Sequence, residues 1–206
     1  MARMVKNYPI RDEFLILTNG KRTETNYFES LKSYKSVFKV QVKFLNDDPK
    51  SLVKHAISEK NDSNHVWCVF DKDQFPSASI YEALDLAKQS DIHVAFSNIA
   101  FEVWLVNHFC QCYAEKSVSE LMKELNSHLK IIGHNEYSKN DVRMISKVFL
   151  PRLNTAMQNA DIVHQKRVLN YRNDGHLDER YPICEWNSYT NIHLLIKAMK
   201  LEKMQD

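Results

Sequence analysis

The stretch of sequence that decides the fold begins with Val66-Trp67-Cys68-Val69-Phe70-Asp71-Lys72-Asp73 and continues to Phe109. Its apolar opening predicts a strand buried on both faces, as in a parallel sheet. A second predicted strand, residues 92–96, ends in Ser97-Asn98. Because α/β sheets bind ligands at the carboxyl ends of their strands, the polar residues after both strands predict a binding site there.

Strand and helix patterns alternate through residues 1–112. Residues 14–18 predict a first buried strand, and residues 38–44, from Phe38 on, alternate apolar with polar side chains, which predicts an edge strand. Helices are predicted after each strand, with Thr23 capping the first and Asp48-Pro49 starting the second. This alternation predicts an α/β fold: a mainly parallel sheet flanked by helices. If the spatial order is 2-1-3-4, the first and third strands are neighbours and their ends meet at one crevice.

The remaining residues, 113–206, predict a helical elaboration packed on this core as one structural unit. An amphipathic helix is predicted over 119–129, and a longer one is capped by Ser138 and broken or kinked at Pro151. Residues 170–182 predict an exposed loop, and a final helix starts near Thr190.

Composition sets the class of protein but not its partner. The chain has 206 residues, 44% hydrophobic and 26% charged, and a formal net charge of +2, which neither demands nor excludes a nucleic-acid partner. The start lacks the apolar core of a signal peptide, and no apolar run approaches membrane-spanning length, so we expect a cytoplasmic protein without membrane contact. The four cysteines form no CxxC pair, which argues against a structural zinc site and favours reduced thiols.

The strongest candidate for chemistry is the pair Asp71 and Asp73. Alternate residues at a strand end point the same way, so both carboxylates can reach one cation, and hard oxygen ligands suit Mg²⁺ or Mn²⁺. Acidic turns also follow strands for purely structural reasons.

The loop Asn19-Gly20-Lys21-Arg22 is a second candidate. It is not a P-loop, because the required first glycine is Leu15. A glycine turn with two basic side chains at a helix amino terminus still favours an anion, although an ordinary tight turn explains the same residues. In the predicted strand order this loop faces Asp71 and Asp73 across one crevice, and Lys72, Ser97 and Asn98 are expected to join them in binding phosphate or nucleic acid.

The helix predicted after the second strand holds two further candidates for the site, Glu102 and His108. Glu102 falls in the first turn, where the helix dipole alone favours a carboxylate. His108 is more often a hydrogen-bonded core histidine than a ligand or base.

Three segments together resemble the RloB family, which includes the abortive-infection protein AbiLii and is found beside restriction-modification genes and ATPase partners. They are Gly20 to Phe28, Val69 to Asp73 and Ser97 to Phe109, and the later Asn187-Ser188-Tyr189-Thr190-Asn191-Ile192-His193 resembles the family's Asn-Pro-Ser-Thr-x-Val-His segment. Members of the family are similar to Toprim domains, in which a glutamate after the first strand and an Asp-x-Asp after the third hold Mg²⁺. The resemblance therefore implies that Asp71 and Asp73 are metal ligands.

One residue departs from the family pattern. Where the family places glutamate before the glycine of the first loop, this chain has Asn19, which can ligate through its carbonyl oxygen but has no negative charge and cannot act as a base. Either Glu24 or Glu102 supplies the missing carboxylate, or this member is a weakened enzyme.

The function expected from the resemblance is that of a Mg²⁺-dependent nuclease in antiphage defence, acting on RNA, tRNA or DNA with an AAA or ABC-type ATPase partner, with homo-oligomers as a further expectation. The alternative is a catalytically impaired sensor or regulatory subunit that binds an ATPase, a phage protein or nucleic acid; Asn19 favours it. A third reading, an enzyme acting on small phosphate esters, requires a closed pocket rather than an open basic groove.

Overall fold

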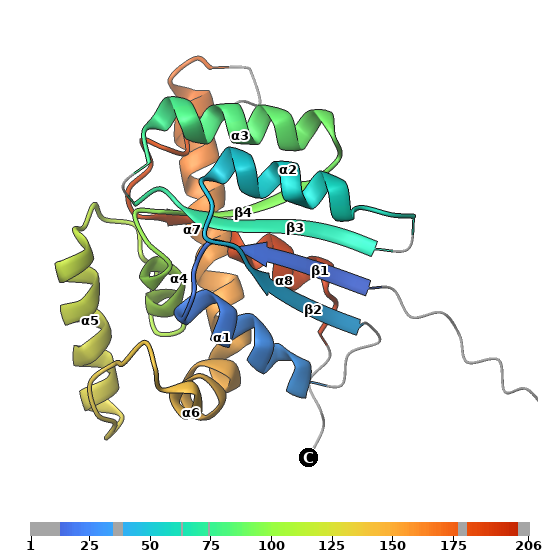
Figure 1. The fold of residues 1–206 in the computed structure, drawn as a ribbon. Coiled ribbons are helices and arrows are strands. Elements are labelled where there is room, and N and C mark those ends of the chain that lie inside the picture. The colour runs from blue at the N-terminus through green and yellow to red at the C-terminus, as the bar shows by residue number, and fades with distance from the viewer. Residues whose placement is uncertain (1–12, 35–38, 63, 74, 177–180, 202–206) are drawn as a thin grey trace, which may run out of the picture.

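The computed structural model describes residues 13–34, 39–62, 64–73, 75–176 and 181–201, and its centre is a five-stranded sheet (Figure 1). The strands lie in the spatial order β2-β1-β3-β4-β5. They are β1 (Glu13–Thr18), β2 (Lys39–Phe44), β3 (Asn64–Asp71), β4 (His93–Asn98) and β5 (Tyr189–Thr190). The first four are parallel, which confirms the predicted α/β class and the edge position of β2. Their order is the 2-1-3-4 order on which the common crevice depends, and Phe38 lies outside the described residues.

Helices cover both faces of the sheet. Two of them, α2 (Pro49–Glu59) and α3 (Ser77–Gln89), lie together on one face (Figure 1). The remaining helices lie on the opposite face or at the carboxyl ends of the strands (Figure 1). They are α1 (Thr23–Ser30), α4 (Glu102–Asn107), α5 (Val118–Ile131), α6 (Val142–Met144), α7 (Leu153–Asn173) and α8 (Ile192–Ala198).

The two faces of the sheet bury separate apolar clusters. In β1, Leu15 and Leu17 pack against α2 and α3, whereas Phe14 and Ile16 pack toward the helices of the other face. Successive side chains of a strand point to opposite faces, so a strand covered on both sides must be apolar throughout. This requirement explains why β1 and β3 read as unbroken apolar runs.

A buried hydrogen bond joins α1 to the end of α4. The Tyr27 hydroxyl lies 2.9 Å from Nε2 of His108, whose Nδ1 lies 3.0 Å from the Trp104 carbonyl oxygen. Because a carbonyl can only accept, Nδ1 carries the proton and Nε2 accepts from Tyr27. Burial lowers the pKa of His108 to about 3, so the ring is neutral. The prediction that His108 is a core histidine is confirmed.

The carboxyl-terminal segment contributes a strand as well as helices, which the sequence pattern did not indicate. β5 is antiparallel to β4, and the Asn191 side chain extends the pairing by accepting from the Phe96 amide at 2.6 Å and donating to the Val94 carbonyl at 3.2 Å. Asn191 thereby continues the edge of the sheet beyond the two residues of β5.

Several local predictions need correction. Arg22, not Thr23, occupies the N-cap position of α1, and the cap before α6 is Asp141, not Ser138. A π turn at Ile145–Phe149 and a 3₁₀ turn at Leu150–Arg152 precede α7, so the chain is irregular around Pro151 as predicted, but regular α geometry already ends at Met144. The predicted loop over 170–182 is partly wrong, because α7 continues to Asn173; residues 177–180 lie outside the described residues.

We predict that Tyr27→Phe lowers the free energy of unfolding by about 1–3 kcal/mol, because it leaves the buried Nε2 of His108 without a donor. Urea unfolding measures the loss. Tyr113→Phe is the control, since its hydroxyl accepts from the exposed Asn170 at 3.0 Å and its loss should cost much less. Equal stabilities for the two variants would contradict the prediction.

Candidate active site: an acidic cleft at the strand ends

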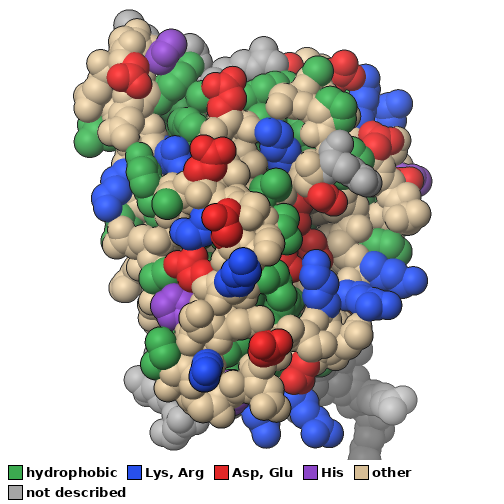
Figure 2. Space-filling model, turned by 90° about the vertical axis from the view of Figure 1, so that its left-hand side faces the viewer, with side chains coloured by type: hydrophobic (Ala, Val, Ile, Leu, Met, Phe, Trp, Pro, Cys, Tyr) green, Lys and Arg blue, Asp and Glu red, His purple; other side chains and the backbone are tan. Residues whose placement is uncertain are grey.

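A cleft of about 560 Å³ opens at the carboxyl ends of the parallel strands. Figure 2 shows the face toward which these ends point, with Asp and Glu side chains gathered in a hollow and Lys and Arg side chains near its rim. Residues from the loops after β1, β2, β3 and β4, and from two more distant segments, line the cleft. They are Asn19, Gly20, Lys21, Arg22, Thr23, Glu24, Asn46, Asp47, Asp48, Asp71, Asp73, Phe75, Ala100, Glu102, Val118 and Lys139.

The first loop is shaped around Gly20. Its amide donates to the Thr18 hydroxyl at 3.0 Å, and its carbonyl accepts from the Thr25 hydroxyl at 2.7 Å. A Cβ atom at this position would collide with the carboxyl group of Glu24. The glycine therefore makes room for a carboxylate that returns from the first turn of α1 to the loop.

Asp71 is the last residue of β3 and lines the cleft. Its Oδ2 accepts from the Phe101 amide at 2.8 Å, which ties the end of β3 to the start of α4. Its Oδ1 is buried and has no hydrogen-bond partner among the described residues. A buried carboxylate oxygen without a donor can still accept a hydrogen bond or coordinate a cation from the cleft.

Asp73 reaches the cleft by a different route from the one predicted. β3 ends at Asp71, so Asp73 does not continue the strand alternation; it lies in a turn with φ of 33° and donates its amide to the Ile99 carbonyl at 3.0 Å. Both aspartates nevertheless line the same cleft, and Gly20 lies at the exit of the neighbouring strand.

Glu102 is buried at the start of α4 and is paired with a distant lysine. Its Oε1 lies 3.0 Å from Nζ of Lys139, whose side chain is 55% exposed. Burial lowers the pKa of Lys139, but Glu102, Glu24 and Asp71 outweigh burial and raise it. Lys139 is therefore a fixed positive charge beside the carboxylates.

The carboxylates raise one another's affinity for protons. Burial, followed by the charges of Glu24 and Glu102, raises the pKa of Asp71 well above its usual range. Burial also raises the pKa of Glu24, and the charge of Glu102 adds to this rise. Two like charges this close are costly unless a proton or a cation lies between them.

These residues fit a hard divalent cation. Asp71 offers a buried oxygen, and the cleft also holds the carboxylates of Glu24, Asp73 and Glu102, the ligand type that Mg²⁺ and Mn²⁺ prefer. The carboxylates are not gathered as tightly as a complete cage: among the described residues, three potential ligand atoms lie within 4.8 Å of one another only at Cys110, Glu124 and His128. Mg²⁺ commonly takes one or two carboxylates and completes its shell with water and substrate phosphate, so a looser set is sufficient.

Three predicted site residues lie outside the cleft lining. The Ser97 hydroxyl lies 3.2 Å from that of Thr190, and the Asn98 side chain donates to the Cys184 carbonyl at 2.8 Å. The Lys72 ammonium donates to the same carbonyl at 2.8 Å. All three contact residues of the carboxyl-terminal segment and none lines the cleft, so Ser97 and Asn98 do not face it as expected. A role of these residues in binding phosphate or nucleic acid stays a prediction.

Other lining residues were missed or underweighted. Lys139 comes from a segment remote in sequence, and nothing local marks it. Asp47 and Asp48 follow β2. Polar residues after a parallel strand predict a binding site, and this applies to Asp47 and Asp48 as it does to the residues after the other strands. Asp48 caps α2 by accepting from the Lys50 and Ser51 amides, and Asp47 lies 3.2 Å from His55, so both have local structural roles.

We predict that Asp71→Asn stabilises the metal-free protein at neutral pH. The pKa of Asp71 in the folded protein lies above 3.8, the ordinary value that applies to the unfolded chain. The contribution of Asp71 to stability is therefore complete below pH 3.8 and is lost as pH rises through the folded pKa. The loss is at most about 1.4 kcal/mol per pH unit. Urea unfolding in EDTA between about pH 4 and about pH 8 should therefore show a smaller decline in the variant. Asp62→Asn, at an exposed position, is the control; a decline of equal size in Asp71→Asn and the parent would refute the assignment.

Comparison with known proteins places the chain in a family. Within the described residues, no helix combines the length and apolar character that a membrane span requires. No curated protein and no solved structure gives a match. A family model described as RloB-like protein matches residues 14–199, which span the elements from β1, without its first residue, to α8 and include all the residues that line the cleft. The chain therefore belongs to the RloB-like family.

Proposed function

We propose that the protein is a Toprim-like, Mg²⁺-dependent nuclease that cleaves phosphodiester bonds of RNA, tRNA or DNA in antiphage defence. Membership of the RloB-like family suggests a defence-associated protein. The observation that carries the proposed activity is the buried Oδ1 of Asp71, without a partner among the described residues, in a cleft it shares with Glu24, Asp73 and Glu102. A proton or a cation relieves the repulsion within such a set, and in this proposal a divalent cation takes that place beside the open cleft.

Asp71, Asp73 and Glu24 are the residues that would hold the metal. When bound, Mg²⁺ or Mn²⁺ would polarise the scissile phosphate and lower the pKa of an attacking water. Glu24 takes the part that the family's glutamate before the glycine plays, because its carboxyl group lies against Gly20. In this proposal Asn19 has not removed the carboxylate from the site; Glu24 supplies it from the adjoining helix.

The cations of the cleft would position the substrate. Lys21 and Arg22 are exposed at its edge, where they can contact successive phosphates of a nucleic-acid backbone. Lys139, oriented by Glu102 at 3.0 Å, supports negative charge that accumulates on the phosphate during cleavage. Exposed cations at the rim favour a long polyanion over a small phosphate ester, which would need an enclosed pocket.

The second candidate is a sensor or regulatory subunit of a defence complex, favoured by Asn19. In that case the cleft would bind nucleic acid or a phage protein without turnover. An AAA or ABC-type ATPase partner and homo-oligomer formation are proposals that apply to both candidates. Cleavage assays with the cognate ATPase present separate them.

We predict that Glu24→Gln lowers Mg²⁺-dependent cleavage by at least about 100-fold. Loss of a residue that only hydrogen-bonds to a metal ligand costs roughly 10–100-fold, and loss of a direct ligand should cost more. The double variant Asn19→Glu/Glu24→Gln should recover part of the lost activity, because it returns the carboxylate to the position before Gly20. The assay compares cleavage of tRNA and single-stranded DNA in Mg²⁺ and in EDTA, with Asp71→Asn as the inactive reference.

Two outcomes would contradict this scheme. Full activity of Glu24→Gln would exclude Glu24 as the replacement carboxylate. No cleavage by the parent, with the ATPase present and Mg²⁺ binding shown by calorimetry, would favour the sensor.

We also predict that Lys21→Gln/Arg22→Gln weakens nucleic-acid binding and reduces its dependence on salt. The slope of log Kd against log salt concentration should fall by about 0.7–0.9 for each phosphate contact removed. Fluorescence anisotropy in Ca²⁺, to prevent turnover, measures the slope. Lys54→Gln, on the exposed side of α2, is the matched control, and an unchanged slope in the double variant would exclude the rim as the binding surface.

A further inference from the structure

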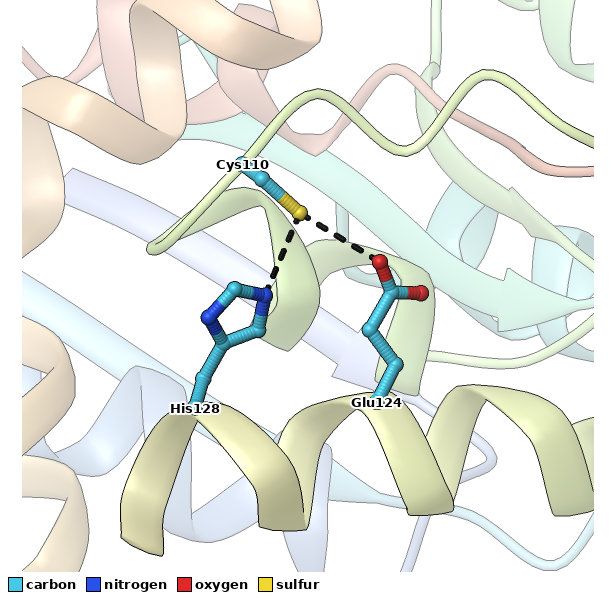
Figure 3. A group of neighbouring side chains, drawn as sticks. All are labelled: Cys110, Glu124 and His128. Atoms are coloured by element: carbon cyan, nitrogen blue, oxygen red, sulfur yellow. Dashed lines mark hydrogen bonds between the residues drawn. The ribbon is translucent and has the colours of Figure 1, made fainter. Parts of the chain in front are cut away.

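A second group of potential ligands lies away from the acidic cleft, between the end of α4 and the middle of α5 (Figure 3). Cys110 follows α4, and Glu124 and His128 lie one helical turn apart on α5, with all three side chains directed toward one another (Figure 3). Cys110 Sγ lies 3.4 Å from His128 Nε2 and 3.5 Å from Glu124 Oε1. All three ligand atoms lie within 4.8 Å of one another.

These separations are those of ligands around a tetrahedral zinc ion. With sulfur at about 2.3 Å and nitrogen or oxygen at about 2.0–2.1 Å from zinc, tetrahedral geometry puts neighbouring ligand atoms about 3.5 Å apart. The Cys110–His128 and Cys110–Glu124 distances match this value without movement of the backbone. The side chains are half-buried, so an ion can enter and a water molecule can complete the shell.

Neighbouring residues hold two of the ligands in place. Glu124 directs Oε1 toward Cys110, while its Oε2 lies 3.2 Å from Nζ of Lys116. The His128 ring stacks on Phe109, with centroids 5.1 Å apart and an interplanar angle of 4°. Metal-binding side chains are commonly oriented by such outer contacts.

We propose that Cys110, Glu124 and His128 bind a zinc ion that clamps α5 to the end of α4. A thiolate and a carboxylate neutralise the charge of Zn²⁺, and the Cys110 proton leaves to solvent when the Zn–S bond forms. Sulfur and imidazole ligands select zinc over Mg²⁺, so this site is distinct from the acidic cleft and stands whether or not the protein is a nuclease.

The metal-free cluster has a different chemistry, which the experiment can detect. Burial, reinforced by Glu124, raises the pKa of the Cys110 thiol to about 12. The sulfur is then protonated near neutral pH and donates to Glu124. Without metal there is no thiolate at this position; with metal there is a metal–thiolate bond.

Cobalt titration of the metal-stripped full-length protein tests the proposal. One equivalent of Co²⁺ should produce a thiolate-to-cobalt charge-transfer band together with the intense visible bands of tetrahedral cobalt, and Zn²⁺ should displace both. Cys110→Ala should abolish the charge-transfer band, and Cys110→Ala and His128→Ala should each raise the Kd for Zn²⁺ by at least about 100-fold, because each removes a direct ligand. Lys116→Met should weaken Zn²⁺ binding by roughly 10-fold, as expected for an outer contact.

Matched variants control for the loss of any cysteine or histidine. Cys184→Ala, in the segment before β5, and His134→Ala, exposed beyond α5, should retain the band and the affinity. Circular dichroism should show the helix content of every variant unchanged, since Leu121, Leu125 and Leu129 keep α5 packed on the core. A parent protein without the charge-transfer band, or equal Zn²⁺ affinity of the parent and Cys110→Ala, would overturn the proposal.

Discussion

The hydrogen bond from the Tyr27 hydroxyl to His108 fixes the relation between the two helices that carry Glu24 and Glu102, two acids of the cleft. Both groups are fully enclosed, and Phe101, Trp104 and Phe149 surround them with edge-to-face contacts. Glu24 lies one helical turn before Tyr27 on α1, and Glu102 lies at the start of the helix that ends beside His108. The positions of both carboxylates therefore depend on the enclosed contact between Tyr27 and His108, although neither carboxylate is part of it.

The apolar layers also make the acidic cleft energetically feasible. Burial of one Leu or Phe side chain contributes about 1.5–3 kcal/mol, and the sheet buries such residues on both faces. Crowded carboxylates cost free energy, as the raised pKa of Asp71 indicates. The core offsets that cost in the folded chain, so groups that repel one another can be held in place for a ligand rather than for stability.

The features predicted correctly from the sequence are those that depend on local residue patterns and on the order of the strands. The apolar runs of β1 and β3 and the polar residues after them were enough to bring Gly20, Asp71 and Asp73 to one edge of the sheet. β5 was not predictable, because Tyr189–Thr190 is too short to show a period, and it is Thr190 of β5 whose hydroxyl lies beside that of Ser97. Pairings between segments remote in sequence leave no local signal, and Lys139 was missed for the same reason.

The contact between Gly20 and the Glu24 carboxyl group makes the two positions interdependent during evolution. While Glu24 lies over the loop, any larger residue at position 20 must displace it, so substitutions at the two sites cannot be neutral independently. A homologue that regained glutamate at position 19 could lose Glu24 and would then tolerate alanine or serine at position 20. Relatives with a changed glycine should therefore carry the acidic residue in the loop, and a sequence alignment that scores each column separately would mistake this relocation for loss.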